Sequence, residues 1–300
     1  MRENKTRDDV QPPVAAVRSA VAIALAEDVL PLGDLSAMLL PEGSRGRAAF
    51  VARVPGVVAG TGCAEQACLQ VDPELQVAWL VRDGDEVGPD VVIGRVEGRL
   101  RSLLTAERTA LNFLSHLSGV ATAARSYVEA AREANPATRI WDTRKTTPGL
   151  RSLEKAAVRA GGAVNHRGNL SDGVLIKDNH LGSLSINEAV HKALERWPGR
   201  MVEVECDRIE QVAEALDAGA TLVMCDNMTP DQVRECVRLV RAHPRGATRQ
   251  VLVEASGGVT LANVAKYAGA GADVISVGAL THSALALDIG LDLESVNPAE

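Results

Sequence analysis

Aromatic residues and an excess of positive charge are both missing from this 300-residue chain. Only 2% of its residues are Phe, Trp or Tyr, and its formal net charge is −7. Proteins that bind single-stranded nucleic acids stack bases on aromatic side chains, and a nucleic-acid backbone attracts a cationic surface. The composition therefore argues against a nucleic-acid partner.

Cysteines and long apolar runs are also few. The five cysteines form no C-x-x-C pair and leave one residue over, so neither a disulfide framework nor a zinc site is indicated. The apolar stretch 20–26 is short and runs into Glu27 and Asp28, so neither a signal peptide nor a membrane-spanning helix is predicted. We expect a soluble, cytoplasmic protein without a membrane partner.

The chain does have a concentration of cations between residues 139 and 177. Eight Lys and Arg residues lie there against three Asp and Glu residues, a local excess of five. In an acidic protein, such a cluster is typical of a site for a small, highly charged anion. A phosphorylated or polycarboxylated metabolite fits this charge. The cationic donors in the stretch from Arg139 to His180 include Arg144, Lys145, His166, Arg167, Lys177 and His180.

Short apolar runs alternate with amphipathic segments from residue 139 onward, as expected for parallel strands joined by helices. Capping boxes mark helix starts at Ser185 and Thr229, and Asp207 with Glu210 resembles one. The pattern fits an open (β/α) barrel or a doubly wound sheet, and the lack of a G-x-G-x-x-G motif argues against the second. The predicted strands are 139–142, 173–177, 201–205, 221–226, 250–254 and 273–277.

The part of the chain upstream of residue 105 has a different sequence pattern. Strands are predicted at 47–54, 56–60, 75–82 and 90–97, separated by Gly, Pro and Asp turns. A long helix over 105–133, interrupted near Gly119, joins the two parts. We expect an α/β protein with an N-terminal domain over 1–116 and a barrel domain over 117–283, and the sequence leaves open whether 284–300 packs back on the first domain.

Polar residues stand at the ends of successive predicted strands. In a barrel, Lys177, Glu205 and Asp226 meet at one mouth, whereas each of them alone could simply face solvent. Ser256, Gly257 and Gly258 lead toward Thr260, expected at a helix start, and Gly278 follows the next strand. Two such glycine turns are typical of the phosphate site of a barrel.

Several motifs resemble the quinolinate phosphoribosyltransferase family, the carboxylating nicotinate-nucleotide pyrophosphorylases of NAD biosynthesis. They are A-E-R-T-A-L-N-F-L at 106–114, D-T-R-K-T-T-P-G-L-R at 142–151, N-H-R at 165–167, L-S-D-G-V-L-I-K-D-N-H at 170–180, V-E-V-E-C at 202–206, C-D-N-M at 225–228 and A-S-G-G-V at 255–259. The resemblance implies an α/β sandwich domain, an incomplete α/β barrel of six or seven strands, and a homodimer with shared active sites. It also implies phosphoribosyl transfer from 5-phosphoribosyl 1-pyrophosphate to quinolinate, with decarboxylation to nicotinate mononucleotide.

The resemblance also assigns residues. Lys145, Glu205 and Asp226 become catalytic, and Glu205 and Asp226 hold Mg²⁺ indirectly, through water. The implied substrate-binding residues are Arg108 from the partner chain, Thr143, Arg144, Lys145, His166, Arg167, Lys177, Glu205, Asp226, Ser256, Gly257, Gly258, Val277, Gly278 and Ala279. One departure is Asn169, where the family usually has Gly, and we expect Asn169 to take the left-handed backbone conformation that Gly would adopt.

Three other functions remain open from the sequence. A related pyrophosphorylase-like protein could act on another aromatic acid, although the full set of carboxylate donors argues against it. A Schiff-base lyase could use Lys177, since a barrel-strand lysine recurs in such enzymes. The third alternative is a non-catalytic binding protein on the same scaffold.

Overall fold

The computed structural model describes residues 10–247 and 251–297. Residues 1–9 of the predicted first domain, Gln250 at the start of a predicted strand, and 298–300 lie outside the described residues. The chain forms two compact units. The first comprises the residues up to Arg125, 146–162 and those from Leu280 onward, and the second comprises 126–145 and 163–279.

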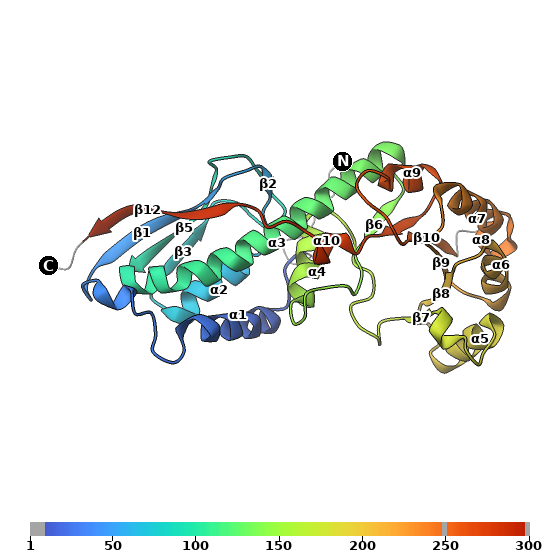
Figure 1. Ribbon diagram of the computed structural model, residues 1–300, viewed down its shortest axis with the longest axis horizontal. Helices are drawn as coiled ribbons and strands as arrows, with labels where there is room; N and C mark the ends of the chain where they lie inside the picture. The colour runs from blue at the N-terminus through green and yellow to red at the C-terminus, as the bar shows by residue number, and fades with distance from the viewer. Residues whose placement is uncertain (1–9, 248–250, 298–300) are drawn as a thin grey trace. The chain divides into compact units, whose positions relative to one another are not determined.

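An antiparallel sheet of four strands forms the centre of the first unit, in the order β12-β1-β5-β3. Strand β12 follows the second unit in sequence but pairs along the whole of β1, from Ala52 opposite Ile289 to Arg45 opposite Asn297 (Figure 1). A two-stranded ribbon of β2 and β4 lies apart from this sheet. The strands are β1 (Arg45–Ala52), β2 (Gly56–Val57), β3 (Gln76–Trp79), β4 (Glu86–Val87), β5 (Val92–Arg99) and β12 (Ile289–Asn297).

Helices run alongside this sheet, and α2 and α3 lie next to it in Figure 1. Their inward faces are built mainly from Ala, Val and Leu, which lets helices and sheet approach closely. No helix in the described residues is long and apolar enough to cross a membrane. The helices of this part are α1 (Val14–Val29), a 3₁₀ turn (Ala37–Leu39), α2 (Thr61–Val71), α3 (Leu100–Ala134) and α4 (Arg151–Ala160).

Helix α3 is continuous through Gly119, and the predicted interruption there is wrong. A Cβ atom at Gly119 would lie 2.0 Å from the carbonyl oxygen of Leu285 and 3.0 Å from the Cα of Ala286. Gly119 is therefore a point of close approach between the helix and the segment that leads into β12. The preference of glycine for turns is overridden here because no larger residue fits.

Helix α4 belongs to the first unit, although its sequence lies within the range predicted for the barrel. The buried carboxylate of Glu154 explains this placement, since its Oε1 lies 2.8 Å from Nε2 of His116 on α3. Its Oε2 accepts a hydrogen bond of 3.1 Å from the backbone N–H of Thr147. Glu154 thus connects α3 to the turn that follows Lys145.

The second unit is built on a parallel sheet of six strands in the order β6-β11-β10-β9-β8-β7. All six strands predicted from the sequence are present, and the predicted α/β fold with an open β/α barrel is confirmed. The sheet is open between β6 and β7, and a single parallel bridge from Trp141 to Val164 extends it beyond β6. The strands are β6 (Arg139–Trp141), β7 (Val174–Ile176), β8 (Val202–Cys206), β9 (Leu222–Asp226), β10 (Leu252–Ser256) and β11 (Val274–Ser276).

Helices connect these strands, and two of the predicted helix starts are confirmed. Ser185 and Thr229 each form a complete capping box. The box predicted at Asp207 is displaced by one residue: Arg208 is the capping position, and Gln211 accepts its backbone N–H. The helices are α5 (Ile186–Arg196), α6 (Ile209–Ala218), α7 (Pro230–Ala242), α8 (Pro244–Ala247) and α9 (Val264–Gly269), with a 3₁₀ turn at Asp178–His180 and α10 (Ala279–His282) after β11.

Candidate active site

The carboxyl ends of four neighbouring strands carry the polar residues singled out from the sequence. Asp226 ends β9 and pairs in register with Ser256, which ends β10. Glu205 lies on β8, and Lys177 directly follows β7. The Nζ of Lys177 forms an ion pair with Oε2 of Glu205. The parallel sheet therefore brings these residues to one edge, as expected for a barrel mouth.

The largely buried ring of His166 lies against two buried carboxylates of the second unit. Its Nε2 is 3.1 Å from Oε2 of Glu203 on β8 and 3.5 Å from Oε2 of Glu254 on β10. Trp141 packs edge-on against the imidazole, with ring centroids 5.0 Å apart. The backbone N–H of His166 donates to the carboxylate of Asp142 at 2.8 Å. This hydrogen bond fixes the loop that leads from His166 to β7.

The charge state of His166 follows from these contacts. Burial by itself lowers the pKa of His166, but the adjacent carboxylates of Glu203 and Glu254 outweigh it and raise the pKa to about 9. Burial raises the pKa of Glu203, and the charge of Glu254 adds to this effect. The two carboxylates of this cluster therefore favour the charged form of the imidazole.

Two arginines approach each other beside this cluster. Burial lowers the pKa of Arg167, and the positive charge of Arg144 lowers it further. The guanidinium of Arg167 donates from Nη1 to the carbonyl oxygen of Gly173 at 3.3 Å. Two half-buried guanidinium groups repel each other, and an anion with two carboxylates would relieve that repulsion.

The turn that carries Thr143 to Lys145 is tied to the His166 loop. Asp142 is fully buried and also accepts a hydrogen bond of 2.7 Å from the side chain of Asn165. The hydroxyl of Thr143 accepts the backbone N–H of Lys145 at 3.0 Å, which shapes the turn, and the Lys145 side chain is exposed. The sequence motif thus holds Arg144 and Lys145 on a fixed turn at the end of β6.

The glycine turn after β10 lies against Asn227. Gly257 has φ +86°, and a Cβ there would lie 2.3 Å from Oδ1 of Asn227. The carbonyl of Gly258 accepts a hydrogen bond of 3.0 Å from Asn263. The expectation of a helix start at Thr260 is wrong, because α9 begins only at Val264. The turn therefore offers backbone groups for a phosphate without a helix directly behind it.

The segment after β11 is placed by its neighbouring strand. The backbone N–H of Val277 donates to the carbonyl of Trp141 at 2.9 Å, so that Gly278 and Ala279 follow directly beyond the sheet edge. Val277 is buried, whereas Gly278 and Ala279 are half-buried. These three residues lie at the same strand-end edge as Ser256, next to β10.

One sequence expectation is wrong, and one predicted site residue stands apart from the others. Asn169 does not adopt the left-handed conformation, because the non-glycine residues with positive φ in the described part of the chain are Asp90 and Asn227. Its side-chain oxygen accepts the N–H of Ser171 at 2.7 Å and so closes the loop in another way. Arg108 lies exposed on α3 in the first unit, whereas the other predicted site residues belong to the second.

Sequence reasoning missed Glu203 and Glu254. The available signal was an ionisable residue inside an otherwise apolar run, in V-E-V-E-C and in L-V-E-A-S. Each lies two residues before a predicted site residue, Glu205 or Ser256, and alternation along a strand places both members of each pair on one face. A charge in a buried strand interior is rare enough to mark a site.

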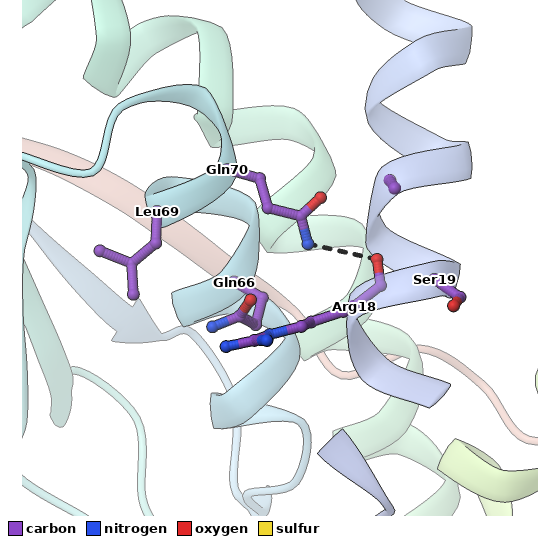
Figure 2. A pocket seen from close by; sticks show the side chains of 6 residues that line it. Arg18, Ser19, Gln66, Leu69 and Gln70 are labelled. Atoms are coloured by element: carbon purple, nitrogen blue, oxygen red, sulfur yellow. Dashed lines mark hydrogen bonds between the residues drawn. The ribbon is translucent and has the colours of Figure 1, made fainter. Parts of the chain in front are cut away.

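A separate hollow in the first unit lies between α1 and α2 (Figure 2). Gln70 bridges its rim by donating to the carbonyl oxygen of Arg18 at 3.2 Å. Arg18 is the one charged residue among those that line it, which are Arg18, Ser19, Ala22, Gln66, Leu69 and Gln70. This hollow therefore lacks the convergence of acidic and basic groups found at the strand ends of the second unit.

Comparison with known proteins bears on both units. The model of the quinolinate phosphoribosyl transferase N-terminal domain matches residues 34–118, and that of the C-terminal domain matches 120–292. A probable carboxylating nicotinate-nucleotide pyrophosphorylase of Synechocystis sp. is 42% identical over 90% of this chain and 90% of its own. The carboxylating nicotinate-nucleotide pyrophosphorylase of Mycobacterium leprae is 41% identical, over 93% of this chain and 97% of its own.

Solved structures agree. The nicotinate-nucleotide pyrophosphorylase of Francisella tularensis has a TM-score of 0.88 at 35% identity and covers 95% of this chain and 99% of its own. NadC from Streptococcus pyogenes has a TM-score of 0.87 at 33% identity, with 97% and 99% covered. The two matched domains, the shared fold and the strand-end residues lead to one conclusion. This chain belongs to the quinolinate phosphoribosyltransferase family, the carboxylating nicotinate-nucleotide pyrophosphorylases.

Proposed function

We propose that the protein transfers the phosphoribosyl group of 5-phosphoribosyl 1-pyrophosphate to the ring nitrogen of quinolinate and releases pyrophosphate and CO₂. The product is nicotinate mononucleotide, a precursor in NAD biosynthesis. The observation that carries this function is the set of cationic groups gathered at the mouth of the second unit, which suits a dicarboxylate beside a polyphosphate. The family of the chain supports the same reaction.

Each group has a role in this reaction. Arg144, Arg167, His166 and Lys177 bind the two carboxylates of quinolinate and orient its ring nitrogen. Lys145, on its exposed turn, contacts the pyrophosphate that departs. Backbone N–H groups of the turns at 256–258 and 277–279 hold the 5′-phosphate. Positioning and charge stabilisation are sufficient, since the sugar passes through an oxocarbenium-like state.

Decarboxylation then needs no nucleophile from the protein. Once the ring nitrogen carries the ribose it is cationic, so it stabilises the electron pair left at C2 when CO₂ departs, and a proton from solvent then forms the C2–H bond of the product. Lys177 is paired with the carboxylate of Glu205, whereas a Schiff-base lyase needs a lysine amine that is available to attack a carbonyl. Borohydride in the presence of a carbonyl substrate should therefore trap no covalent adduct on Lys177.

The residues present fit a divalent cation. Glu205 and Asp226 are half-buried carboxylates at adjacent strand ends, and oxygen ligands with intervening water are what Mg²⁺ prefers. When bound there, Mg²⁺ would neutralise charge on the pyrophosphate. Apart from the metal, Glu205 and Asp226 accept hydrogen bonds from the ribose hydroxyls, and the side-chain amide of Asn227 keeps Asp226 oriented by donating to it at 2.7 Å.

A homodimer with shared sites is part of the proposal. An apolar surface on the first unit is between 54% and 86% exposed and comprises Leu30, Leu32, Leu35, Met38 and Leu39. Hydrogen bonds fix this segment to α3 on both sides of Arg108, from Thr105 to Asp34 and from Thr109 to Asp28. A second copy that covers this surface would meet Arg108, which would then complete the carboxylate site of that copy.

The five cysteines support a reducing location. All five are free and buried in the structure, so none contributes a disulfide. We therefore include a cytoplasmic location in the proposal.

The direct test measures CO₂ released from carboxyl-labelled quinolinate. Release should require both phosphoribosyl pyrophosphate and Mg²⁺, and nicotinate should be a poor substrate. A monocarboxylate leaves one half-buried cation unpaired, which costs about 3 kcal/mol or more and corresponds to roughly a hundredfold in kcat/KM. Turnover of nicotinate at a comparable rate would contradict the carboxylate assignment, and another aromatic diacid used in preference would favour the pyrophosphorylase-like alternative.

The shared site has a separate test. Arg108→Ala and Lys145→Ala should each be nearly inactive, yet a mixture allowed to exchange subunits should regain activity. One site of each heterodimer collects both defects and the other has none. Half of the wild-type activity per heterodimer is expected, whereas a mixture as inactive as its components after proven exchange would place Arg108 outside the partner's site.

A further inference from the structure

Two buried glutamates of the second unit have no role in the proposed phosphoribosyl transfer or in the decarboxylation. Glu203 and Glu254 are both 0% exposed and lie on the inward faces of β8 and β10. An ionised carboxylate in a buried strand needs a compensating partner. The cation that contacts both of them, among the residues the structure describes, is the imidazole of His166.

The geometry divides the imidazole into two edges. The Nε2 edge faces the glutamates, and the ligand atoms of all three side chains lie within 4.8 Å of one another. The Nδ1 edge lies 2.7 Å from the backbone nitrogen of Arg167, whose N–H donates to it. A proton on Nδ1 would turn that contact into two adjacent donors, which need a shared acceptor. A substrate carboxylate provides one.

We propose that Glu203 and Glu254 are positioning residues for the substrate-carboxylate site. They hold the Nε2 edge of His166 and favour its charged form, so that Nδ1 and the Arg167 amide together form a two-donor seat for one carboxylate oxygen. This inference rests on the proposed function, because the ligand of the seat is a carboxylate of quinolinate. Neither glutamate touches the substrate, and both act through His166.

The groups that face His166 support this assignment. Glu203 comes from β8 and Glu254 from β10, Asp142 at the end of β6 accepts its backbone N–H, and Arg167 follows it in the same loop. The charge of Arg144 acts on Arg167 from the neighbouring turn. The two carboxylates raise the pKa of His166 to about 9 in spite of its burial. The two carboxylates therefore favour the charged ring through the neutral range, and a bound substrate carboxylate would accept from both Nδ1 and the Arg167 amide.

The test compares the pH dependence of kcat/KM for quinolinate in the wild-type enzyme, Glu203→Gln, Glu254→Gln and the double variant. In the wild type this ratio should stay level up to about pH 9 and fall above it. In the double variant it should fall from about pH 6.5 or below, the ordinary value for histidine. At pH 8.5 the KM for quinolinate should then rise by about 75-fold or more, with intermediate rises in the single variants.

Other kinetic constants separate this role from a general loss of structure. The turnover number at saturating quinolinate and the KM for phosphoribosyl pyrophosphate should change less than about threefold, and at pH 6 the KM for quinolinate should be nearly normal. Glu214→Gln, the same exchange on the exposed face of α6, is the control and should match the wild type at every pH.

Several results would overturn the proposal. One is a kcat/KM for quinolinate that already falls above pH 6.5 in the wild-type enzyme. This result does not depend on whether the variants fold. Another is an unshifted profile in folded variants. A third is one tightly bound metal ion per wild-type chain that is lost in the double variant, which would make the three side chains a metal site. A wild-type enzyme with no turnover at all would instead refute the proposed function.

Discussion

Gly119 allows a stability prediction whose sign depends on one close approach. Replacing Gly by Ala inside a helix normally stabilises it by about 1 kcal/mol. In α3, however, the new Cβ would lie 2.0 Å from the carbonyl oxygen and 2.9 Å from the carbonyl carbon of Leu285, which are backbone atoms and cannot rotate away. The segment at 285–287 must move by about 1 Å, and overpacking of this kind costs about 1–3 kcal/mol.

The same movement disturbs the hydrogen bond of 2.9 Å from the N–H of Leu287 to the carbonyl of Ser115, worth about 1 kcal/mol. We expect Gly119→Ala to lower the free energy of unfolding by about 2 kcal/mol, the balance of these effects. For a urea dependence of ~1–3 kcal/mol/M, the midpoint falls by about 0.7–2 M. Trp79 provides a fluorescence signal from the first unit, where it stacks on Phe50.

Gly269→Ala is the matched control, since Gly269 ends α9 and a Cβ there would meet no atom within 4 Å. It should leave the stability unchanged or raise it by up to about 1 kcal/mol. If Gly119→Ala is as stable as the parent protein, the close approach of Leu285 does not explain why glycine occupies this position.

Three further predictions follow from single contacts. The free energy of unfolding should fall by about 3 kcal/mol as the pH rises from 6.5 to about 9, because the folded chain keeps a proton on His166 that the unfolded chain releases. Equal urea midpoints at pH 6 and pH 9.5 would contradict this prediction. Glu154→Gln should cost about 2 kcal/mol of stability in the same urea assay, since it removes the charge that His116 and the Thr147 amide share; an unchanged midpoint would show that these contacts are not stabilising. Gly257→Ala should raise the KM for phosphoribosyl pyrophosphate at least about tenfold because its Cβ would collide with Asn227, whereas Gly88→Ala, with open space around it, should not.

The second unit was the easier part to predict. Its strands are continuous apolar runs that end in a polar residue, and that pattern is clearest in β8, β9 and β10, which are buried on both faces. The candidate site residues at the strand ends follow from the same rule and from motifs that resemble one family. The capping boxes at Ser185 and Thr229 could also be predicted, since each depends only on two residues that lie three positions apart in the sequence.

The remainder depended on contacts between distant residues. No residue near Gly119 in the sequence indicates that the backbone of Leu285 packs against it, so the glycine was interpreted as an interruption of the helix. The return of α4 to the first unit depends on Glu154 meeting His116, 38 residues earlier. Glu203 and Glu254 lie 51 residues apart, and only the sheet order that places β9 between their strands brings them both to His166.

The pairing of β12 with β1 has a consequence for how the protein is made. At about 5–20 residues per second, a ribosome needs roughly 10–50 seconds to proceed from Ala52 to Ile289. During that interval the whole second unit emerges, while β1 has only β5 as a partner and its other edge presents unpaired N–H and C=O groups. Nascent chains are therefore vulnerable to edge-to-edge aggregation until residues 289–297 arrive. Strand β12 carries none of the candidate site residues, yet its arrival determines how long the edge of β1 stays unpaired in the nascent chain.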